Sequence, residues 1–483
     1  MAKKKKKALP LLGLLLVLIL LIVAYVAYDQ YDKKKQKDKE AQKEASAIIV
    51  TSMEEDSLTS ITIKSSQGEI NLVKDDTDEW IEKENPEVPI DVDKVDGIVT
   101  ALVKLEALKV VAEDVNDLSE YGFDEPKVTI STVDQDGKEQ TLKIGEDSPL
   151  GDGSYVYLDG QKNVYLVGTE VISSLNQTRN TIVEMASAPS IASNSIRHLL
   201  LNGKNGELEI AYDAKNPYNY SSMDNNYVIT KGLNGPVLGD TKEITSYFDH
   251  YGKISYGACV ENECSDLSKY GLDQPATRIE VTYLEDAEKE DSNLLTYSLA
   301  IGSYDEEKAV YYVKEDNSNA VYTITKSLVE GLTDYKVLNL VDNYAHLVAL
   351  VSLDELKVTA NGQTHSLTIK RTPSEIEGEE DVSTYYVDGV EANEDRAKGM
   401  YNNFLTIERD AMIPEGYTDE DKEPIVVFEF ARSKGTNAEN VKVEYREYDD
   451  SFYTITINGS ENFLIDKRKV DTAVKAISEY KED

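Results

Sequence analysis

The chain has 483 residues and carries 90 Asp and Glu against 51 Lys and Arg, which gives a formal net charge of −39. A body this acidic is repelled by nucleic acid and by anionic lipid, so composition argues against a nucleic-acid-binding protein. The length is sufficient for several domains with cores of their own.

The first 48 residues divide into three segments of different composition. Residues 1–7 contain five lysines, and residues 8–28 carry no charge and are mostly Leu, Val, Ile and Ala. About 20 apolar residues are needed to cross the hydrocarbon core of a bilayer. We therefore predict a cytoplasmic tail at 1–7, a single transmembrane helix in the lipid bilayer at 8–28, and a charged stalk at 29–48. A cleaved signal peptide is the alternative, although its apolar core is usually shorter and ends in small residues.

The orientation of this segment follows from weaker signals. Five lysines precede the apolar stretch and five follow it before residue 41, so the positive-inside rule does not decide. The α-amino group before the stretch and the acidic residues after it favour a cytoplasmic N-terminus. The acidic body also suits an aqueous exterior. We predict a single-pass protein of the cell membrane with its C-terminal body outside the cytoplasm.

One amphipathic pattern occurs three times in the body of the chain. Its apolar residues are separated by three, one, three and three positions, a spacing that predicts the same helix face in each copy. The three sets are Val95, Ile98, Val99, Leu102 and Leu105; Ile244, Tyr247, Phe248, Tyr251 and Ile254; and Ala397, Met400, Tyr401, Phe404 and Ile407.

A turn signature and several strand patterns follow each helix. Leu118–Pro126 reads LSEYGFDEP and returns at Leu267–Pro275 as LSKYGLDQP, whereas the third copy retains only Glu415–Tyr417 and a later proline. Alternating strands come next, with an Ile-Gly pair at Ile144–Gly145 and at Ile301–Gly302. Tight hairpin turns are predicted where Asn or Asp precedes Gly, at Asp136–Gly137, Asn202–Gly203, Asn361–Gly362 and Asn458–Gly459.

These elements predict an α+β fold. The N-terminal transmembrane helix is followed by three tandem modules, each a mainly antiparallel sheet with an amphipathic helix. A parallel layout is disfavoured because one helix for five or six strands cannot cover both faces of a sheet. The modules are predicted at 49–188, 189–343 and 344–483, the third being divergent, and each is large enough for its own core.

Cys259 and Cys264 are the only two cysteines in the chain. Aligned on the first module they fall on Val110 and Val115, which are apolar positions. Two interpretations stay open: a pair of buried small hydrophobic side chains, or a structural disulfide formed in an oxidising exterior. The spacing does not match the Cys-x-x-Cys pattern of redox sites.

The sequence predicts no catalytic, cofactor-binding or metal-binding residues. Neither the Gly-x-Ser-x-Gly elbow of hydrolases nor a phosphate-binding glycine-lysine loop occurs in it. No histidine has a second His or Cys at ligand spacing. We therefore predict a protein that is not an enzyme and uses no cofactor. The four histidines are His198, His250, His346 and His365.

The repeated Leu-Ser-x-Tyr-Gly-[Phe/Leu]-Asp-x-Pro segment, followed by Ile-Gly and a Tyr-Val-Tyr-type strand, resembles a bacterial family known only as a domain of unknown function. The resemblance covers most of residues 50–335 well and the rest weakly. Members carry an N-terminal membrane segment and an extracytoplasmic body, and they are often encoded beside gliding-motility-type ABC transporters. The resemblance implies an accessory role for such a transporter and supplies no catalytic residues.

We predict a membrane-anchored, extracytoplasmic, non-catalytic binding or scaffold protein, with the subunits of an ABC-type transporter complex as its partners. Two alternatives remain. The 31 tyrosines, against 7 phenylalanines and one tryptophan, suit a cell-envelope protein that binds polysaccharide through tyrosine-bearing strands, and an enzyme of unrecognised class is the other. Because the residues shared by the modules are mostly core and turn, function should be sought where the three copies differ.

Overall fold

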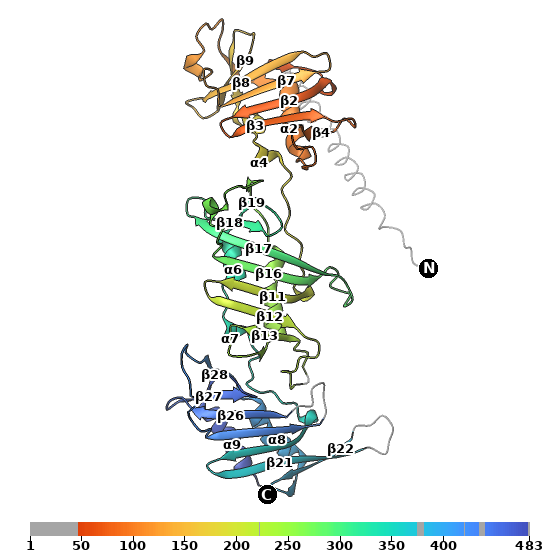
Figure 1. Cartoon of the computed structure of the whole chain (residues 1–483), viewed down its shortest axis with the longest axis vertical. Coiled ribbons are helices and arrows are strands. Elements are labelled where there is room, and N and C mark those ends of the chain that lie inside the picture. Colours follow the sequence, from red (N-terminus) through yellow and green to blue (C-terminus); the bar gives the residue numbers. More distant parts are fainter. Residues whose placement is uncertain (1–46, 222, 374–380, 420, 434–439, 482–483) are drawn as a thin grey trace, which may run out of the picture. The chain divides into compact units, whose positions relative to one another are not determined.

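The computed structural model describes residues 47–221, 223–373, 381–419, 421–433 and 440–481 (Figure 1). The chain divides into two compact units, residues 1–185 and residues 186–483. The first unit contains one large sheet, and the second unit contains two.

The sheet of the first unit has eight antiparallel strands in the order β4-β3-β2-β7-β8-β9-β10-β6. A separate pair, β1 (Ile48–Ser52) and β5 (Lys104–Ala107), forms a small second sheet. The helices are α2 (Val92–Val103), α3 (Thr169–Leu175) and α4 (Arg179–Ile182), with the 3-10 turns η1 (Glu55–Ser57) and η2 (Ser119–Tyr121). The strands are β2 (Leu58–Ser65), β3 (Gly68–Lys74), β4 (Trp80–Glu82), β6 (Lys109–Ala112), β7 (Val128–Asp134), β8 (Glu139–Asp147), β9 (Gly153–Leu158) and β10 (Val164–Gly168).

The first sheet of the second unit repeats this plan with nine antiparallel strands, in the order β14-β13-β12-β11-β16-β17-β18-β19-β15. Its strands are β11 (Ile196–Gly203), β12 (Gly206–Tyr212), β13 (Tyr227–Lys231), β14 (Val237–Leu238), β15 (Cys259–Glu261), β16 (Thr277–Leu284), β17 (Leu294–Asp305), β18 (Val310–Glu315) and β19 (Val321–Thr325). Its helices are α5 (Thr241–Phe248), α6 (Lys326–Thr333) and α7 (Val337–Leu340), with the 3-10 turns η3 (Ser193–Ser195), η4 (Tyr251–Lys253) and η5 (Leu267–Tyr270).

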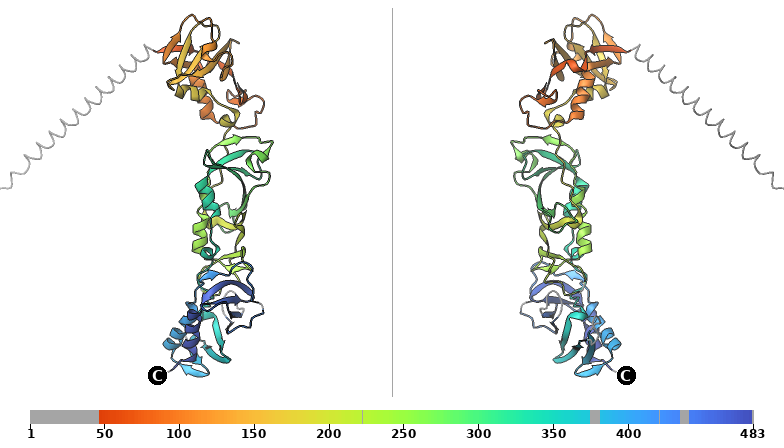
Figure 2. Two further views of the ribbon diagram at one scale, coloured as in Figure 1. Left: turned by 90° about the vertical axis from the view of Figure 1, so that its left-hand side faces the viewer. Right: turned by 90° about the vertical axis from the view of Figure 1, so that its right-hand side faces the viewer.

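The second sheet of this unit also has nine antiparallel strands, in the order β23-β22-β21-β20-β25-β26-β27-β28-β24. Its helices α8 (Glu394–Leu405) and α9 (Lys467–Ser478) pack on one face of the sheet (Figure 2), and η6 (Leu350–Ser352) precedes its first strand. The strands are β20 (Leu353–Ala360), β21 (Gln363–Thr372), β22 (Val382–Val387), β23 (Val390–Ala392), β24 (Ala411–Met412), β25 (Val426–Arg432), β26 (Val441–Glu447), β27 (Phe452–Ile457) and β28 (Ser460–Asp466).

The predicted helix face forms in every module. A side chain at the position before the helix accepts a hydrogen bond from a first-turn N–H in each case: Asp91 for α2, Asp240 for α5 and Asn393 for α8. Such caps satisfy amides that have no partner within the helix. In the second module the α-helix ends at Phe248 and the face continues through η4, where Tyr251 is fully buried.

The two signature motifs of the repeat pack against each other. A Cβ atom at Gly145 would lie 2.0 Å from the carbonyl oxygen of Tyr121, and one at Gly302 would lie 2.2 Å from that of Tyr270. The Ile-Gly strand therefore needs glycine because the Tyr-Gly turn crosses it at backbone distance. Strand register places Arg446 at the corresponding position of the third module. A side chain there excludes such a crossing, which explains why the turn signature is lost in that copy.

The predicted fold class is wrong. Four antiparallel sheets dominate the described residues, and the helices are few and short, so the fold is mainly β rather than α+β. The α+β prediction gave too much weight to the one conspicuous amphipathic helix in each module and too little to the many short strands. Among the described residues, no helix is both long and apolar enough to cross a membrane. The segments predicted as tail, transmembrane helix and most of the stalk lie outside the described residues.

The hairpin predictions are confirmed at Asn361–Gly362 and Asn458–Gly459, where both residues have positive φ. Gly137 also has positive φ, between β7 and β8. The prediction at Asn202–Gly203 is wrong because both residues belong to β11, and the chain turns after them. Gly206, with φ +94°, supplies the left-handed conformation there.

Candidate functional site

A connecting segment, residues 341–349, joins the two sheets of the second unit, and we call it the seam. Its start pairs with the second module through a bridge between Gly239 and Val341. It then pairs with the third module, where the Ala345 N–H donates to the Ile407 carbonyl at 2.8 Å and the Tyr401 hydroxyl donates to the Val348 carbonyl at 2.8 Å. Both modules therefore hold the backbone of the seam by hydrogen bonds.

Arg409 lies directly opposite the seam, just after α8. Its Nη1 donates to the carbonyls of Asp342 and Tyr344, and its Nη2 donates to the carbonyl of Ala345 at 3.1 Å. The guanidinium also stacks over the Phe463 ring, 4.8 Å from the ring centroid. Burial lowers the pKa of Arg409 to about 10, so the side chain remains a cation at neutral pH.

His346 lies on the seam, with its ring buried against the aromatic side chains of the third sheet. Its centroid is 5.7 Å from that of Phe428 and 5.5 Å from that of Phe430. Its Nε2 lies 2.6 Å from the hydroxyl oxygen of Tyr445. Burial, with a smaller contribution from the positive charge of Arg409, lowers the pKa of His346 to about 4. The imidazole is therefore neutral at pH 7 and carries one ring proton.

Asp342 completes the polar group at the start of the seam. One carboxylate oxygen accepts from the Tyr344 N–H at 2.8 Å, and the other accepts from the Asn225 side-chain amide at 2.8 Å. Burial raises the pKa of Asp342, and Arg409 partly opposes that shift. The two charges are close enough to interact, although no direct ion pair joins them among the described residues.

These side chains border a cavity of about 70 Å³ within the second unit. The Nε of Arg409 and the Nδ1 of His346 are both buried and have no hydrogen-bond partner among the described residues. Unpartnered buried polar atoms are uncommon and need an explanation. The cavity is lined by Tyr218, Tyr220, Pro236, Val237, Leu238, Asp342, Tyr344, Ala345, His346, Leu347, Arg409, Ile455, Ile457, Asn458, Ser460 and Phe463.

The position of Arg409 carries a different residue in each module. The next residue donates its N–H to the neighbouring strand in every copy: Leu108 to Leu166, Gly257 to Thr323, and Asp410 to Leu464. The residues before them, Ala107, Tyr256 and Arg409, are therefore equivalent. In the second module the Tyr256 ring stacks on Tyr322 at 4.6 Å, the counterpart of the Arg409 guanidinium on Phe463.

The buried tyrosine that pairs with His346 is also specific to the third module. Tyr445 lies opposite Val426 in the sheet, as Ile144 lies opposite Val128 and Ile301 lies opposite Thr277. A core position that is isoleucine in two modules thus carries a hydroxyl in the third. The polar site exists only where the third copy departs from the repeat.

The two cysteines belong to the second module and do not line this cavity: Cys264 lies in a small hydrophobic cluster, and Cys259 packs against the large core of the second unit. The structure holds both as free thiols, with Cys259 half-buried on β15 and Cys264 buried. Burial raises the pKa of both thiols. Their pairing as a disulfide stays a prediction. Among the described residues, no group of three or more His, Cys, Asp and Glu side chains could hold a metal ion.

Tyrosines of the second module contact one another and nearby carboxylates. The Tyr270 hydroxyl donates to Glu261 at 2.7 Å, and the Tyr312 hydroxyl donates to Asp305 at 2.6 Å. The rings of Tyr270 and Tyr312 pack together with centroids 4.8 Å apart. These contacts stabilise the module, and they engage hydroxyls that a polysaccharide-binding face would need.

The sequence prediction did not identify Arg409, Asp342 or His346 as a site. His346 was considered only as one of four scattered histidines. The sequence does mark Arg409. The positions two residues beyond Leu105, Ile254 and Ile407 are equivalent in the three copies, and they hold Ala107, Tyr256 and the charged Arg409. The contact of Arg409 with the seam could not be found this way, since the seam has no helix or strand pattern.

A comparison with protein-family models gives a match to the family described as domain of unknown function (DUF4340). It matches residues 26–126, 80–226 and 228–425, which together span most of the chain. The chain belongs to this family. The three DUF4340 matches agree with the repeated architecture and confirm the resemblance to a family of unknown function. No curated protein and no solved structure matches the chain.

Proposed function

We propose that this DUF4340 protein is a non-catalytic binding or scaffold protein that works outside the cytoplasm as an accessory to an ABC-type transporter complex. The observation that carries the scaffold part is the shared core of the second unit. A single hydrophobic cluster includes buried residues of both nine-stranded sheets, from Ile191 to Ile477. Two sheets built around one core form a frame that resists relative movement, as a scaffold requires.

The transporter part rests on the genomic association that the family resemblance implies. Localisation at the cell membrane, with the acidic body outside, belongs to the same proposal and rests on the composition of the N-terminal residues. A net charge of −39 keeps such a body soluble and away from anionic lipid.

Affinity capture tests the proposed partners. The tagged full-length chain is cross-linked in cells and recovered from solubilised membranes, and its partners are identified by mass spectrometry. We expect transporter subunits to be recovered reproducibly. Repeated recovery of none would overturn the transporter part of the proposal.

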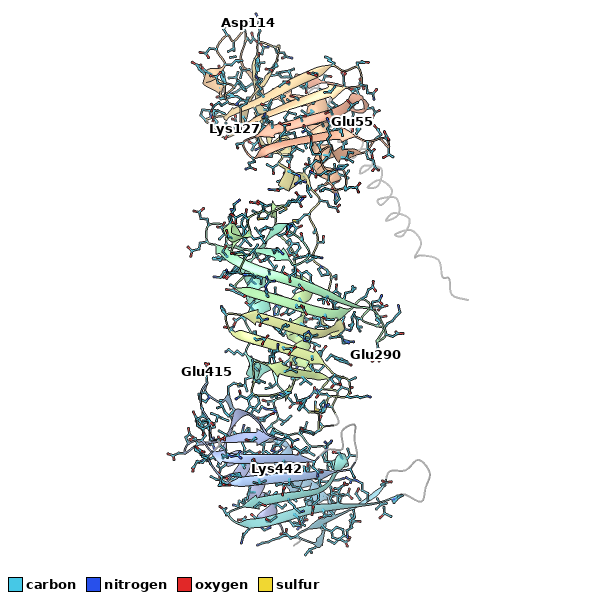
Figure 3. All side chains as sticks on the ribbon, in the orientation of Figure 1. Glu55, Asp114, Lys127, Glu290, Glu415 and Lys442 are labelled. Carbon is cyan, nitrogen blue, oxygen red and sulfur yellow. The ribbon has the colours of Figure 1, made fainter. Side chains whose placement is uncertain are left out.

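Two charge-matched variants sharpen this capture. Arg409→Met removes the buried cation at the seam, whereas Lys442→Met removes an exposed cation from β26 of the same module (Figure 3). We expect capture to fall with Arg409→Met and to remain with Lys442→Met if the frame of the second unit presents the partner surface. Equal capture by both variants would show that the partner does not depend on that frame.

The location of the body is tested on intact cells. Protease added outside should digest the acidic body while a cytoplasmic marker protein stays whole. Protection of the body until the cells are lysed would contradict an extracytoplasmic location.

A further inference from the structure

Strand β17 of the second module has a backbone edge that no neighbouring strand covers. Its second half pairs with β18, but β18 ends at Glu315, opposite Leu299, and the chain then turns towards β19. The first half, Leu294–Ser298, pairs with β16 on one side, and among the described residues no strand pairs with its other side. The last contact on that outer side is the Asp316 N–H, which donates to the Ser298 carbonyl at 3.3 Å.

The hydrogen-bond pattern identifies the backbone groups that face this free edge. The Asn293 carbonyl accepts from the Glu285 N–H at 2.9 Å and therefore faces β16, whereas the Ser298 carbonyl is bonded on the outer side. Successive residues of an antiparallel strand direct their N–H and C=O groups to alternate sides. Leu294 and Thr296 therefore direct theirs outward, where they offer two donors and two acceptors to an added strand.

The first module has a shorter edge at the same place. Thr141 and Ser298 each lie three residues before the Ile-Gly pair, and the Thr141 carbonyl also accepts from the next strand segment, through Asp159 at 2.9 Å. The outward residue before Thr141 is Glu139, where β8 begins, whereas β17 extends two positions further. Charged side chains such as this glutamate commonly protect a strand edge from pairing. The free edge of β17 is thus specific to the second module.

The side chains along the free edge are apolar or uncharged. Leu294 is 59% exposed and Leu295 is 39% exposed, and Thr296 is also exposed. A pocket of about 120 Å³ lies beside them, lined by Thr296, Tyr297, Ser298, Glu315, Asp316 and Asn317. A strand added to β17 would cover the leucines and run towards this pocket.

Charge determines the class of segment that fits this edge. The Glu315 carboxylate lines the pocket and accepts from the Tyr256 hydroxyl at 2.7 Å, and no Lys or Arg of the described residues pairs with it. The connection from β16 to β17, residues 285–293, adds five acidic residues against one lysine, Lys289, which forms an ion pair within the connection. Glu290 marks this connection in Figure 3. So acidic an edge attracts a cationic segment and repels a second copy of itself.

We propose that the free edge of β17 binds an extended segment of a partner protein that carries lysine or arginine, by β-strand addition. The backbone of the segment bonds to Leu294 and Thr296, its apolar side chains cover the exposed leucines, and a cationic side chain pairs with Glu315. The inference goes beyond the scaffold proposal and does not depend on the transporter, because it concerns the chemistry of the bound segment.

Fluorescence anisotropy with the full-length chain tests this binding. The probe is a fluorescein-labelled Lys-Val-Lys-Val-Lys-Val peptide. One control replaces each lysine with glutamate, and a second carries an N-methyl group on every amide, which removes the backbone donors and keeps the charge. We expect saturable binding of the probe and at least tenfold weaker binding of both controls. No binding of the probe would overturn the proposal. Equal binding of the N-methylated peptide would overturn it as well, since overall charge alone would then hold the peptide.

Two proline variants form a matched pair. Thr296→Pro removes an outward N–H of β17 and leaves the bonds to β16 in place, and Glu139→Pro does the same at the corresponding position of β8. We expect Thr296→Pro to weaken binding of the probe at least tenfold and Glu139→Pro to leave it unchanged. If Thr296→Pro does not fold, Leu294→Lys tests the same edge, because it places a cation beside the bound peptide and should cause a similar loss. Undiminished binding by a folded edge variant would contradict the proposal.

Residue-resolved amide hydrogen exchange locates the bound probe on the chain. We expect the probe to slow exchange at Leu294 and Thr296, whose N–H groups face outward, and to leave Leu295 unchanged because its N–H faces β16. Protection confined to another strand would overturn the proposal. Mass photometry of the chain alone identifies the competing occupant. A dimer that is lost in Thr296→Pro would place a second copy on the edge and would also contradict the proposal.

Discussion

The second and third modules use the same position after the helix in opposite ways. Tyr256 stacks on Tyr322, and its hydroxyl lies 2.9 Å from that of Tyr297 and donates to Glu315 at 2.7 Å. Arg409 stacks on Phe463 at the matching place and donates to the backbone of the seam. The first residue ties its own sheet together, whereas the second ties its sheet to the segment that enters from the preceding module.

The difference shows how a repeat can change role without changing fold. Helix face, N-cap and strand register are kept in both modules, because each is required to bury the same core. The residue after the helix can vary between Tyr256 and Arg409, because an aromatic ring, Tyr322 or Phe463, remains for it to stack on. In the third module that position holds a buried cation, Arg409, which lines a cavity together with the buried His346.

The largest expected effect comes from removing the buried cation. Arg409→Met leaves three backbone carbonyls of the seam without donors, and we expect it to lower the free energy of unfolding of the second unit by about 3–5 kcal/mol. Urea denaturation followed by far-ultraviolet circular dichroism measures this change. Lys442→Met removes an exposed cation and should stay within about 0.5 kcal/mol of the parent chain. A loss below about 1 kcal/mol in Arg409→Met would mean that the seam does not depend on Arg409.

The next effect concerns pH. The pKa of His346 is about 4 in the folded chain, below its ordinary value of 6.5, so the unfolded chain takes up the proton first as the pH falls. The stability that neutral His346 contributes is present above pH 6.5 and is lost as the pH falls towards 4, by about 3 kcal/mol. The stability difference between the parent chain and His346→Phe should fall by that amount between pH 7 and pH 4. Carboxylates titrate in both chains and cancel in the difference, so an unchanged difference would contradict a buried neutral histidine.

The second module also differs from the third at Gly302, where the Tyr-Gly turn crosses the Ile-Gly strand at backbone distance. Gly302→Ala puts a methyl group against the Tyr270 carbonyl, and we expect a loss of about 1–3 kcal/mol in the free energy of unfolding. Gly399→Ala on α8 meets no atom within 4 Å and should instead stabilise by about 0.5–1 kcal/mol. Thermal denaturation of the two variants beside the parent measures both signs. A neutral Gly302→Ala would show that the turn can move away from the strand.

The smallest effect compares the helix caps. Asp240 accepts from two first-turn amides of α5, and Asn393 accepts from one of α8. We expect Asp240→Ala and Asn393→Ala each to cost about 1 kcal/mol, with the larger loss at Asp240. Urea midpoints of the two variants measure this order. The reverse order would show that local packing, and not the number of capped amides, sets the cost.

Local pattern predicted much of this fold. The helix face, the alternating strands and two of the Asn-Gly hairpins follow from side-chain period and backbone preference, which are properties of neighbouring residues. The α+β class was wrong because it gave one helix in each module too much weight, and short edge strands such as β14 and β24 carry too few residues for a pattern. The apolar N-terminal stretch lies outside the described residues, so its transmembrane helix stays a prediction.

The candidate site was predictable only in part. Aligned repeats could single out Arg409 as the odd residue at its position, but not its contact with carbonyls more than 60 residues away. His346 and Asp342 lie in an irregular connection, where their burial depends on how two sheets meet. The unpartnered nitrogens of Arg409 and His346 depend on that packing and have no local sequence signature.

Native-state hydrogen exchange tests whether the seam makes one cooperative unit of the two nine-stranded sheets. Peptides from the central strands β16 and β25 are followed in the full-length chain, with and without low concentrations of urea. We expect the slowest amides of both strands to open with the same free energy and the same dependence on urea, because one core and one seam hold them. Separate opening free energies for the two strands would show that the sheets unfold independently and that the seam does not couple them.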